Sequence, residues 1–359
     1  MMPAETMRQK IKIEAPVRDL RSAKIAISSG ADILYGGIRG WSVRPHIFEM
    51  GQDEFLKVIK LAKSHQKEIL LTMNCFYRSA EIPRALSIIE KMVNAGLSGV
   101  IVSQFGLLKE IKERFPNLSV HISVLASASN TTDLELYRAL GVDNVTLPRN
   151  SVDTSLENIR KFSCKGVGLG VFIIGDDIHN YDGRCYLSSY LNQKLIKDDT
   201  GRDFCAMGSA NKSSFCFIMC KRKSEFIEDS ELRGYDFYLR RQDLVLFTKT
   251  RELIKHGVSF FKIQGREFPT SLTGAFIKTV KDLSGCLENE VKYVKLVNKL
   301  VRLTRIKQQI QANHLWLLAK SKSKFWAKIR KYFQEPWDSL EVAFCLYIPF
   351  FGNLRWKKL

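Results

Sequence analysis

The sequence predicts an α/β fold: a TIM-like (β/α)8 barrel with a cysteine-rich insertion after strand seven and a basic helical C-terminal extension. Two observations lead to this fold class. Short apolar runs alternate with longer amphipathic stretches over the first half of the 359-residue chain, which is typical of βα units around a parallel sheet. Seven such runs precede a long cysteine-bearing interruption, and an eighth follows it. A doubly wound open sheet is the alternative.

The predicted strands are short runs rich in β-branched and other apolar residues, bounded by turn residues. They occupy residues 11–14, 32–35, 69–74, 99–103, 119–124, 144–148, 167–174 and 259–263. Helical stretches at 54–62, 85–94 and 134–140 place apolar residues three and four positions apart, so each has one face for burial. This number of strands suits a closed barrel.

Polar residues that follow the strands have functional weight, because ligands of parallel barrels gather at the carboxyl ends of the strands. The residues in such positions are Arg44, Asn74, Cys75, Gln104, Ser123, Arg149, Lys262 and Arg266. Their cations, Arg44, Arg149, Lys262 and Arg266, are candidates for binding an anionic substrate, or else form structural salt bridges. His121 also follows a strand core, and is either a further site residue or a hydrogen-bonded barrel residue.

The formal net charge of +19 is concentrated near the C-terminus. Residues 291–359 contain 15 Lys and Arg against 3 acids, a net of +12, which leaves +7 for residues 1–290. We therefore expect a barrel domain at 1–290, with the insertion at 175–230, and a basic helical extension at 291–359. Such an extension attracts RNA or an anionic membrane surface by the same electrostatics, or simply covers the barrel as a solvated helix.

The compartment follows from what the chain lacks. Residues 1–12 are polar and charged, and no run reaches the eighteen or so apolar residues that cross a bilayer. Eight cysteines in such a chain favour metal ligands or reduced thiols over disulfides. We expect a cytoplasmic protein, with peripheral attachment to a membrane as an alternative.

Four cysteines cluster in a segment rich in Gly, Asp, Asn and Ser, namely Cys185, Cys205, Cys216 and Cys220. Thiolates are soft ligands, and four of them suit either zinc or an iron-sulfur cluster. The three-residue spacing between Cys216 and Cys220 favours iron-sulfur, because zinc knuckles more often use two. Four cysteines buried as small apolar residues are the remaining alternative. Cys75, which follows the third predicted strand, is the alternative to Cys205 as the fourth ligand.

Several short motifs, in this order, resemble peptidase family U32, the collagenase-like group that includes oxygen-independent hydroxylation proteins for tRNA, rRNA and ubiquinone. The motifs are Glu14-Ala15-Pro16, Asp32 to Gly37 with Ser42 and Arg44, Val120 to Ser123, Leu147 to Arg149, Gly183-Arg184-Cys185, Cys216 to Lys221 and Lys262 to Arg266. The resemblance covers about residues 10 to 283.

The resemblance implies a barrel-like fold and a four-cysteine [4Fe-4S] site. The sequence departs from the family pattern in three places. A His-Gly-x-x-Cys element ahead of Gly-Arg-Cys is replaced by residues 174–178, without that His or Cys. Gln264 stands where the family usually has Glu, and Ser103-Gln104 where it often has Gln-Asp. The missing thiol leaves two candidates for the fourth ligand, Cys205 and Cys75.

Three functions follow as hypotheses. The first is an iron-sulfur oxidoreductase, an oxygen-independent hydroxylase of RNA or a quinone-like ring, or the homologous partner subunit of one, with an electron donor that the sequence does not name. The second is a peptidase, as the family name suggests, although neither His-Glu-x-x-His nor Gly-x-Ser-x-Gly is present. The third is a noncatalytic scaffold or RNA-binding protein with a structural cluster.

Overall fold

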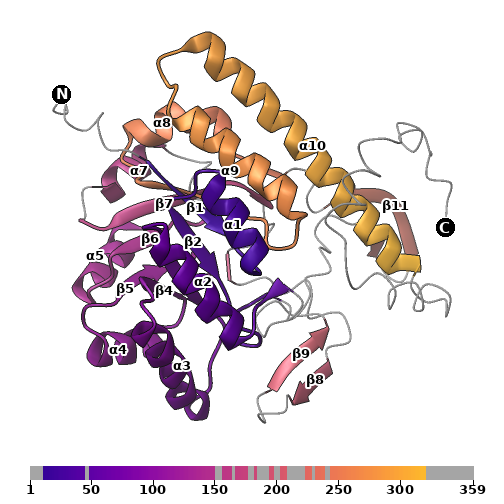
Figure 1. Ribbon diagram of the computed structural model, residues 1–359. Coiled ribbons are helices and arrows are strands. Elements are labelled where there is room, and N and C mark those ends of the chain that lie inside the picture. Colours follow the sequence, from indigo (N-terminus) through magenta and orange to yellow (C-terminus); the bar gives the residue numbers. More distant parts are fainter. Residues whose placement is uncertain are drawn as a thin grey trace. The chain divides into compact units, whose positions relative to one another are not determined.

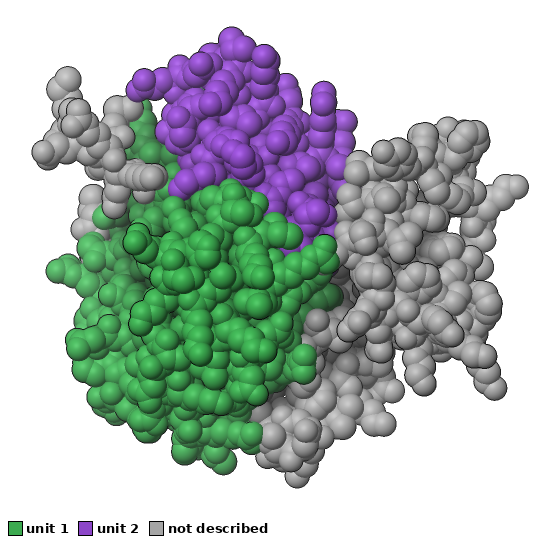
Figure 2. All heavy atoms as spheres, viewed as in Figure 1, with its two compact units in different colours: residues 1–266 green, residues 267–359 purple. Residues whose placement is uncertain are grey.

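The computed structural model describes residues 11–44, 48–149, 156–163, 166–176, 182–183, 194–197, 203–207, 223–228, 231–238 and 243–320. The chain divides into two compact units, residues 1–266 and residues 267–359 (Figure 2). The strands of the described part lie in the first unit, and its last two helices lie in the second.

Eight parallel strands close into a barrel within the first unit (Figure 1). Neighbours follow chain order from β1 to β7, and β13 joins β7 to β1. The strands are β1 Lys12–Pro16, β2 Ile33–Gly36, β3 Glu68–Met73, β4 Gly99–Val102, β5 Ser119–Ile122, β6 Asn144–Thr146, β7 Gly168–Asp176 and β13 Phe260–Ile263. All eight predicted strands are confirmed, and closure of the sheet excludes the doubly wound alternative.

Most strand residues are apolar on both faces, because one face lines the barrel and the other is covered by helices. Strand β3 illustrates this pattern: Ile69, Leu70, Leu71 and Met73 are each at most 1% exposed. Runs of apolar residues of this kind are the pattern from which the strands were predicted. Neighbouring inward side chains make an apolar cluster of Ile33, Tyr35, Leu70 and Ile101.

Helices follow the strands in the alternating order of βα units. In the first unit they are α1 Leu20–Ser28, α2 Gln52–Ser64, α3 Ile82–Asn94, α4 Phe105–Arg114, α5 Thr131–Ala139, α7 Leu156–Ser163 and α8 Thr250–Lys255. The predicted stretches at 54–62, 85–94 and 134–140 coincide with α2, α3 and α5. Side-chain caps fix where two helices begin: Asp19 accepts from Ser22 N at 2.6 Å, and Asn130 accepts from Asp133 N at 2.8 Å.

Between β7 and β13 the described residues form short antiparallel elements. Strands β8 Lys194–Lys197 and β9 Asp203–Met207 pair with each other, as do β10 Lys223–Glu228 and β11 Glu231–Tyr238. Strand β12 Asp243–Val245 pairs antiparallel with the end of β7. Cys205 falls on β9, whereas Cys185, Cys216 and Cys220 lie outside the described residues. The cysteine-rich insertion at 175–230 therefore stays a prediction.

The second unit contains α9 Thr270–Ser284 and α10 Glu290–Lys320, which contact each other. Helix α10 begins where the basic extension was expected. The boundary between the compact units falls at residue 266, and the predicted division at residue 290 stays a prediction. Within the described residues, no helix has the length and apolar character needed to cross a membrane.

Candidate functional site

Lys262 and Glu14 form an ion pair inside the barrel, on the adjacent strands β13 and β1. Lys262 Nζ donates to Glu14 Oε1, and the two residues are 5% and 0% exposed. Burial lowers the pKa of Lys262, an effect that the Glu14 carboxylate opposes. Lys262 Nζ also lies 4.4 Å from the centroid of the Tyr35 ring and 5.7 Å from that of Phe172. The ammonium is thus held by one carboxylate and two aromatic faces.

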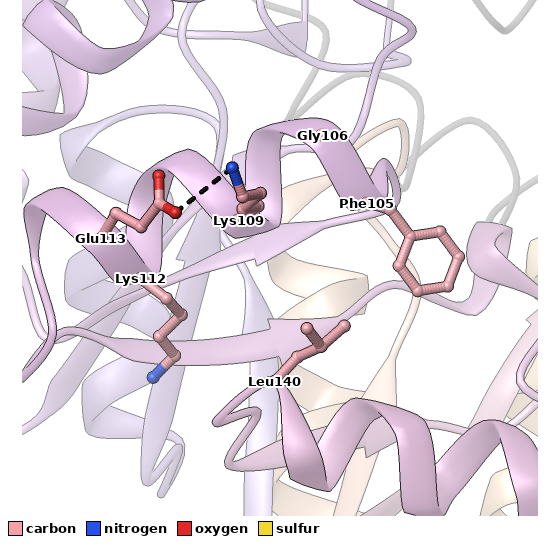
Figure 3. Close-up of a pocket in the computed structure, with 6 residues that line it drawn as sticks. All are labelled: Phe105, Gly106, Lys109, Lys112, Glu113 and Leu140. Atoms are coloured by element: carbon pink, nitrogen blue, oxygen red, sulfur yellow. Dashed lines mark ion pairs between the residues drawn. The ribbon is translucent and has the colours of Figure 1, made fainter.

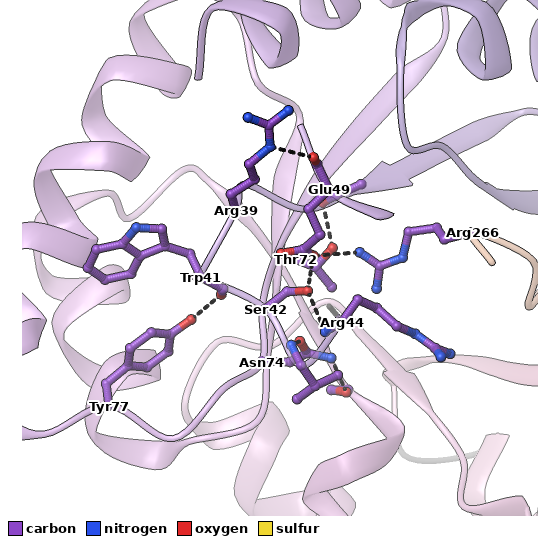
Figure 4. A network of polar contacts seen from close by, with 12 residues as sticks. Arg39, Trp41, Ser42, Arg44, Glu49, Thr72, Asn74, Tyr77 and Arg266 are labelled. Carbon is purple, nitrogen blue, oxygen red and sulfur yellow. Dashed lines mark hydrogen bonds and ion pairs between the residues drawn. The ribbon is translucent and has the colours of Figure 1, made fainter. Parts of the chain in front are cut away.

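Arg266 forms a second buried ion pair just after β13 (Figure 4). Its Nη1 lies 3.0 Å from Glu49 Oε1, and Ser42 Oγ donates to the same oxygen. The guanidinium carbon of Arg266 lies 5.6 Å from the centroid of the Tyr35 ring. A Cβ at Gly37 would lie 2.1 Å from Glu49 Oε1, so only glycine there lets the carboxylate reach Arg266. Gly37 therefore leaves the space that the Glu49–Arg266 ion pair requires.

Arg149 forms a third pair, after β6. Its Nε lies 3.5 Å from Asp182 Oδ1, and its backbone N–H donates to Asp182 Oδ2 at 2.9 Å. Burial raises the pKa of Asp182, while Arg149 acts in the opposite direction. The guanidinium carbon of Arg149 lies 5.0 Å from the centroid of the Phe172 ring.

The three cations are linked by the two rings they share. We call this arrangement the cation–aromatic row, which consists of Arg266, Tyr35, Lys262, Phe172 and Arg149. Each cation has a buried carboxylate partner, so the row is close to charge balance. An anionic substrate would have to share these cations with the carboxylates, which favours a substrate group that is polar but weakly charged.

The loop after β2 is fastened to neighbouring strands by polar contacts (Figure 4). Asn74, just after β3, accepts from Val43 N at 3.3 Å, and its Nδ2 donates to Ser123 Oγ at 3.4 Å. The polar residues predicted to follow β3 and β5 therefore meet each other, and they support the loop.

The same loop is also braced by an aromatic contact. Tyr77 Oη donates to the carbonyl oxygen of Trp41, and the two rings stack with centroids 5.8 Å apart. The backbone N–H of Arg44 donates to Ser42 Oγ at 3.2 Å. Arg44 thus lies in the loop that supplies Ser42 to Glu49.

His121 lies deeper in the barrel, on β5. It is 2% exposed, and Asn144 Nδ2 lies 3.1 Å from its Nε2. Burial, helped by the charges of Lys262 and Lys12, lowers the pKa of His121 to about 3, so the ring is neutral at physiological pH. A neutral, buried imidazole is unsuited to binding an anion.

The structure therefore places the sequence-predicted substrate residues in three different settings. Arg149, Lys262 and Arg266 belong to the cation–aromatic row, and Arg44 lies in the loop that supports it. His121 is an interior residue. Sequence reasoning did not assign Glu14, Glu49, Asp182, Tyr35 and Phe172 to the site. A signal existed for Glu14, because a carboxylate in an otherwise apolar strand needs a buried partner.

The predicted metal ligands lie mostly beyond the described residues. Among the residues that are described, no group of three or more His, Cys, Asp and Glu side chains could hold a metal ion. Cys75 is fully buried after β3. The backbone of Cys205 pairs with Leu195 across the β8–β9 hairpin. The chemistry of the set, four thiols in one insertion, suits iron or zinc.

A separate hollow of about 560 Å³ lies along α4 (Figure 3). It is lined by Phe105, Gly106, Lys109, Lys112, Glu113 and Leu140. Lys109 is paired with Glu113 at 3.3 Å on the same helix. None of the row residues lines this hollow, so it is distinct from the candidate site.

Comparison with known proteins shows relatives that are named for RNA hydroxylation and others that are named as a collagenase or a protease. The tRNA hydroxylation protein P of Escherichia coli is 23% identical over 72% of this chain and 64% of its own length. The 23S rRNA 5-hydroxycytidine C2501 synthase of the same organism is 25% identical over 72% of this chain and 36% of its own. The collagenase of Porphyromonas gingivalis is 24% identical over 71% of this chain and 61% of its own.

The chain thus spans less than two thirds of the length of each of these relatives. Residues 18–324 match the model of peptidase family U32, a region that includes most of the barrel and the whole row. The chain therefore belongs to peptidase family U32.

Proposed function

We propose that this protein takes part in the oxygen-independent hydroxylation of RNA, as the hydroxylase or as its partner subunit. The names of two relatives, a tRNA hydroxylation protein and an rRNA hydroxycytidine synthase, support the reaction class. The structural observation that favours RNA as the substrate is a stripe of exposed cations on α10. A quinone-like ring has no phosphate groups for such a stripe to bind.

The α10 stripe consists of Lys292, Lys295, Lys299, Arg302 and Arg305. The five residues are exposed and follow one another at three or four positions, so they share one face of the helix. At 1.5 Å per residue, the stripe extends about 20 Å. A row of cations of this length suits a phosphate backbone.

An anionic membrane is the competing partner, because Val291 and Val294 on the same helix are 68% and 45% exposed. An interfacial helix, however, needs a broad apolar face with large side chains to enter the lipid. Among the described side chains of α10, the two exposed valines offer little apolar area. The stripe therefore favours RNA.

We assign the cofactor by donor chemistry, as a [4Fe-4S] cluster held by Cys185, Cys216 and Cys220 with Cys205 or Cys75 as the fourth thiolate. Zinc is the alternative metal. When bound, a cluster would supply one-electron transfer. The row residues would bind and orient the reacting base, since buried cations and ring faces can hold the polar edge and plane of a nucleobase.

Hydroxylation replaces a C–H bond of the base with C–OH, which is a two-electron oxidation. Without dioxygen, two balanced routes exist. Water supplies the oxygen atom while a separate acceptor takes the two electrons, or an organic donor supplies the oxygen atom and takes the electrons itself. The reaction therefore requires a second substrate that is reduced by two electrons for each base hydroxylated.

The peptidase alternative lacks support from the described residues. His121, the histidine that the sequence singled out, is buried, and its Nε2 is bonded to Asn144. Its pKa is lowered to about 3, which makes it a weak base and unsuited to activating a nucleophile toward a peptide. The names of two relatives, a collagenase and an uncharacterized protease, are the arguments that remain for proteolysis.

Comparison of RNA nucleosides by mass spectrometry tests the proposal. A strain that lacks this gene should lose one nucleoside that carries an added oxygen atom. The wild-type gene should restore it, and the double variant Cys216→Ser/Cys220→Ser should not. An unchanged nucleoside profile with a changed quinone pool would refute RNA as substrate. Cleavage of collagen or casein by the pure protein would favour the peptidase.

A further inference from the structure

The interior of the barrel is divided into an apolar half and a polar half. Strands β2, β3 and β4 contribute the apolar cluster of Ile33, Tyr35, Leu70 and Ile101. Strands β5, β6, β13 and β1 contribute the polar half. Its buried or hydrogen-bonded members are His121, Asn144, Thr146, Lys262 and Glu14. A polar half in a barrel core requires internal hydrogen-bond partners.

Strand register places these polar residues in neighbouring layers. Alternate strands of a (β/α)8 barrel supply the side chains of one layer, with a shift of one residue per strand. Counted through the strand pairs with that shift, the layer that contains Glu14 on β1 continues with Leu70 on β3 and His121 on β5. Glu14 and His121 therefore lie in the same layer, on opposite sides of the barrel. The pair Lys262↔Glu14 places Lys262 in the next layer toward the carboxyl ends. Asn144 on β6 pairs with His121, and Thr146 lies two residues further toward the carboxyl end of β6. Thr146 therefore lies in the same layer as Lys262.

Three polar atoms in these two layers have no hydrogen-bond partner among the described residues. They are Glu14 Oε2, His121 Nδ1 and Thr146 Oγ1. Their residues are 0%, 2% and 1% exposed, so bulk water does not satisfy them. The other polar atoms of Glu14 and His121 are engaged, by Lys262 and by Asn144.

The three atoms are chemically complementary. The Asn144 amide donates through Nδ2, so His121 Nε2 accepts and Nδ1 carries the proton. Nδ1–H is therefore a donor, Glu14 Oε2 is an acceptor, and the Thr146 hydroxyl serves as either. One donor, one acceptor and one hydroxyl are what a single water molecule uses in a buried site.

We infer that the polar half of the barrel binds an ordered water molecule that bridges Glu14, His121 and Thr146. A charged ligand does not suit the site, because Lys262 already neutralises Glu14 and His121 is neutral. The water would hold Glu14 Oε2 while Oε1 remains with Lys262. It thus stabilises the ion pair at the centre of the cation–aromatic row.

The variant Thr146→Val tests this inference, because the presence or absence of the water decides whether the midpoint of thermal unfolding falls. Valine has nearly the shape of threonine without the hydroxyl. If the water is present, the variant removes one of its partners and lowers the midpoint of thermal unfolding. If the interior is dry, the variant removes an unsatisfied buried hydroxyl and leaves the midpoint unchanged or higher. The control is Thr72→Val, because Thr72 Oγ1 donates to the Gly36 carbonyl and removing that hydroxyl destabilises in either case.

A high-resolution crystal structure of the full chain provides the direct observation. The inference predicts electron density for a water within hydrogen-bond distance of all three atoms, together with a lowered midpoint for Thr146→Val. An interior without that density, or a Thr146→Val protein at least as stable as wild type, overturns it. Should Thr146→Val not fold, the density alone decides.

Discussion

Lys262 and Glu14 show why residue chemistry in this barrel depends on residues far apart in the sequence. The two residues are 248 positions apart, yet their side chains meet on adjacent strands. Arg266 and Glu49 are 217 positions apart. The sequence indicated the cations, because Arg149 and Arg266 follow strands and Lys262 lies near the end of β13. It could not indicate their carboxylate partners, because strand closure decides which acid reaches which cation.

A buried pair of this kind has a testable energetic signature. We expect Lys262→Met alone to lower the free energy of unfolding by about 3–5 kcal/mol, because it leaves Glu14 buried without its counter-charge. The double variant Glu14→Leu/Lys262→Met should lose much less, since no unpaired charge remains. Urea unfolding of the two single variants and the double variant measures the coupling. A double variant as destabilised as the sum of the singles would show that the pair is not coupled.

His121 should make stability depend on pH in a defined window. Its pKa is lowered to about 3 in the folded protein, against an unfolded value near 6.5. The unfolded chain therefore binds the proton first, and folded stability falls as pH decreases below about 6.5. Between pH 7.5 and pH 5 the decrease in stability from this group is about 2 kcal/mol.

The control is His121→Gln, which keeps a partner for Asn144 but does not titrate. Urea unfolding at both pH values should show a smaller decrease for the variant than for wild type, even if the variant is less stable throughout. Equal decreases in the two proteins would mean that His121 is already protonated in the folded state, or is not buried as described. The acidic groups are the same in both proteins, so their contribution cancels in the comparison.

At the scale of the elements, periodicity sufficed for prediction. The eight barrel strands were predicted from short runs rich in apolar and β-branched residues that are bounded by turn residues. Helices α2, α3 and α5 were predicted because apolar residues recur at three and four positions. Ends were less well predicted: β6 ends at Thr146, two residues before the predicted end. The sequence of such a short strand does not reveal where pairing with its neighbours stops.

The prediction about RNA binding concerns the exposed cations of helix α10. Reversing three stripe charges, Lys292→Glu, Lys299→Glu and Arg302→Glu, should weaken RNA binding. The slope of log affinity against log salt should fall by about 1 for each phosphate that no longer pairs with a cation. Fluorescence anisotropy with a labelled transfer RNA, at several salt concentrations, measures both quantities.

A matched control reverses the same number of charges on α2, at Lys57, Lys60 and Lys63. The control and the stripe variant have the same net charge, so total charge cannot account for a difference between them. If both variants bind RNA with the same affinity and the same salt slope, the stripe is not the RNA-binding surface.

At the scale of the whole molecule, the family and the fold agree with what the sequence predicted. The four-cysteine site, the RNA partner and the domain division stay predictions. Cys185, Cys216 and Cys220 lie outside the described residues, so their assignment depends on donor chemistry and on the family motifs around them. Whether Cys205 or Cys75 is the fourth ligand could not be predicted, because two loops far apart in the sequence would have to meet.

The proposal to test first is that this member of peptidase family U32 binds an iron-sulfur cluster. The most direct test is the iron and acid-labile sulfide content of the protein purified without oxygen. We predict about four irons and four sulfides per chain, with a broad visible absorption that disappears in Cys216→Ser. Colourless protein that contains zinc, or protein without metal that still supports RNA hydroxylation, would contradict the account.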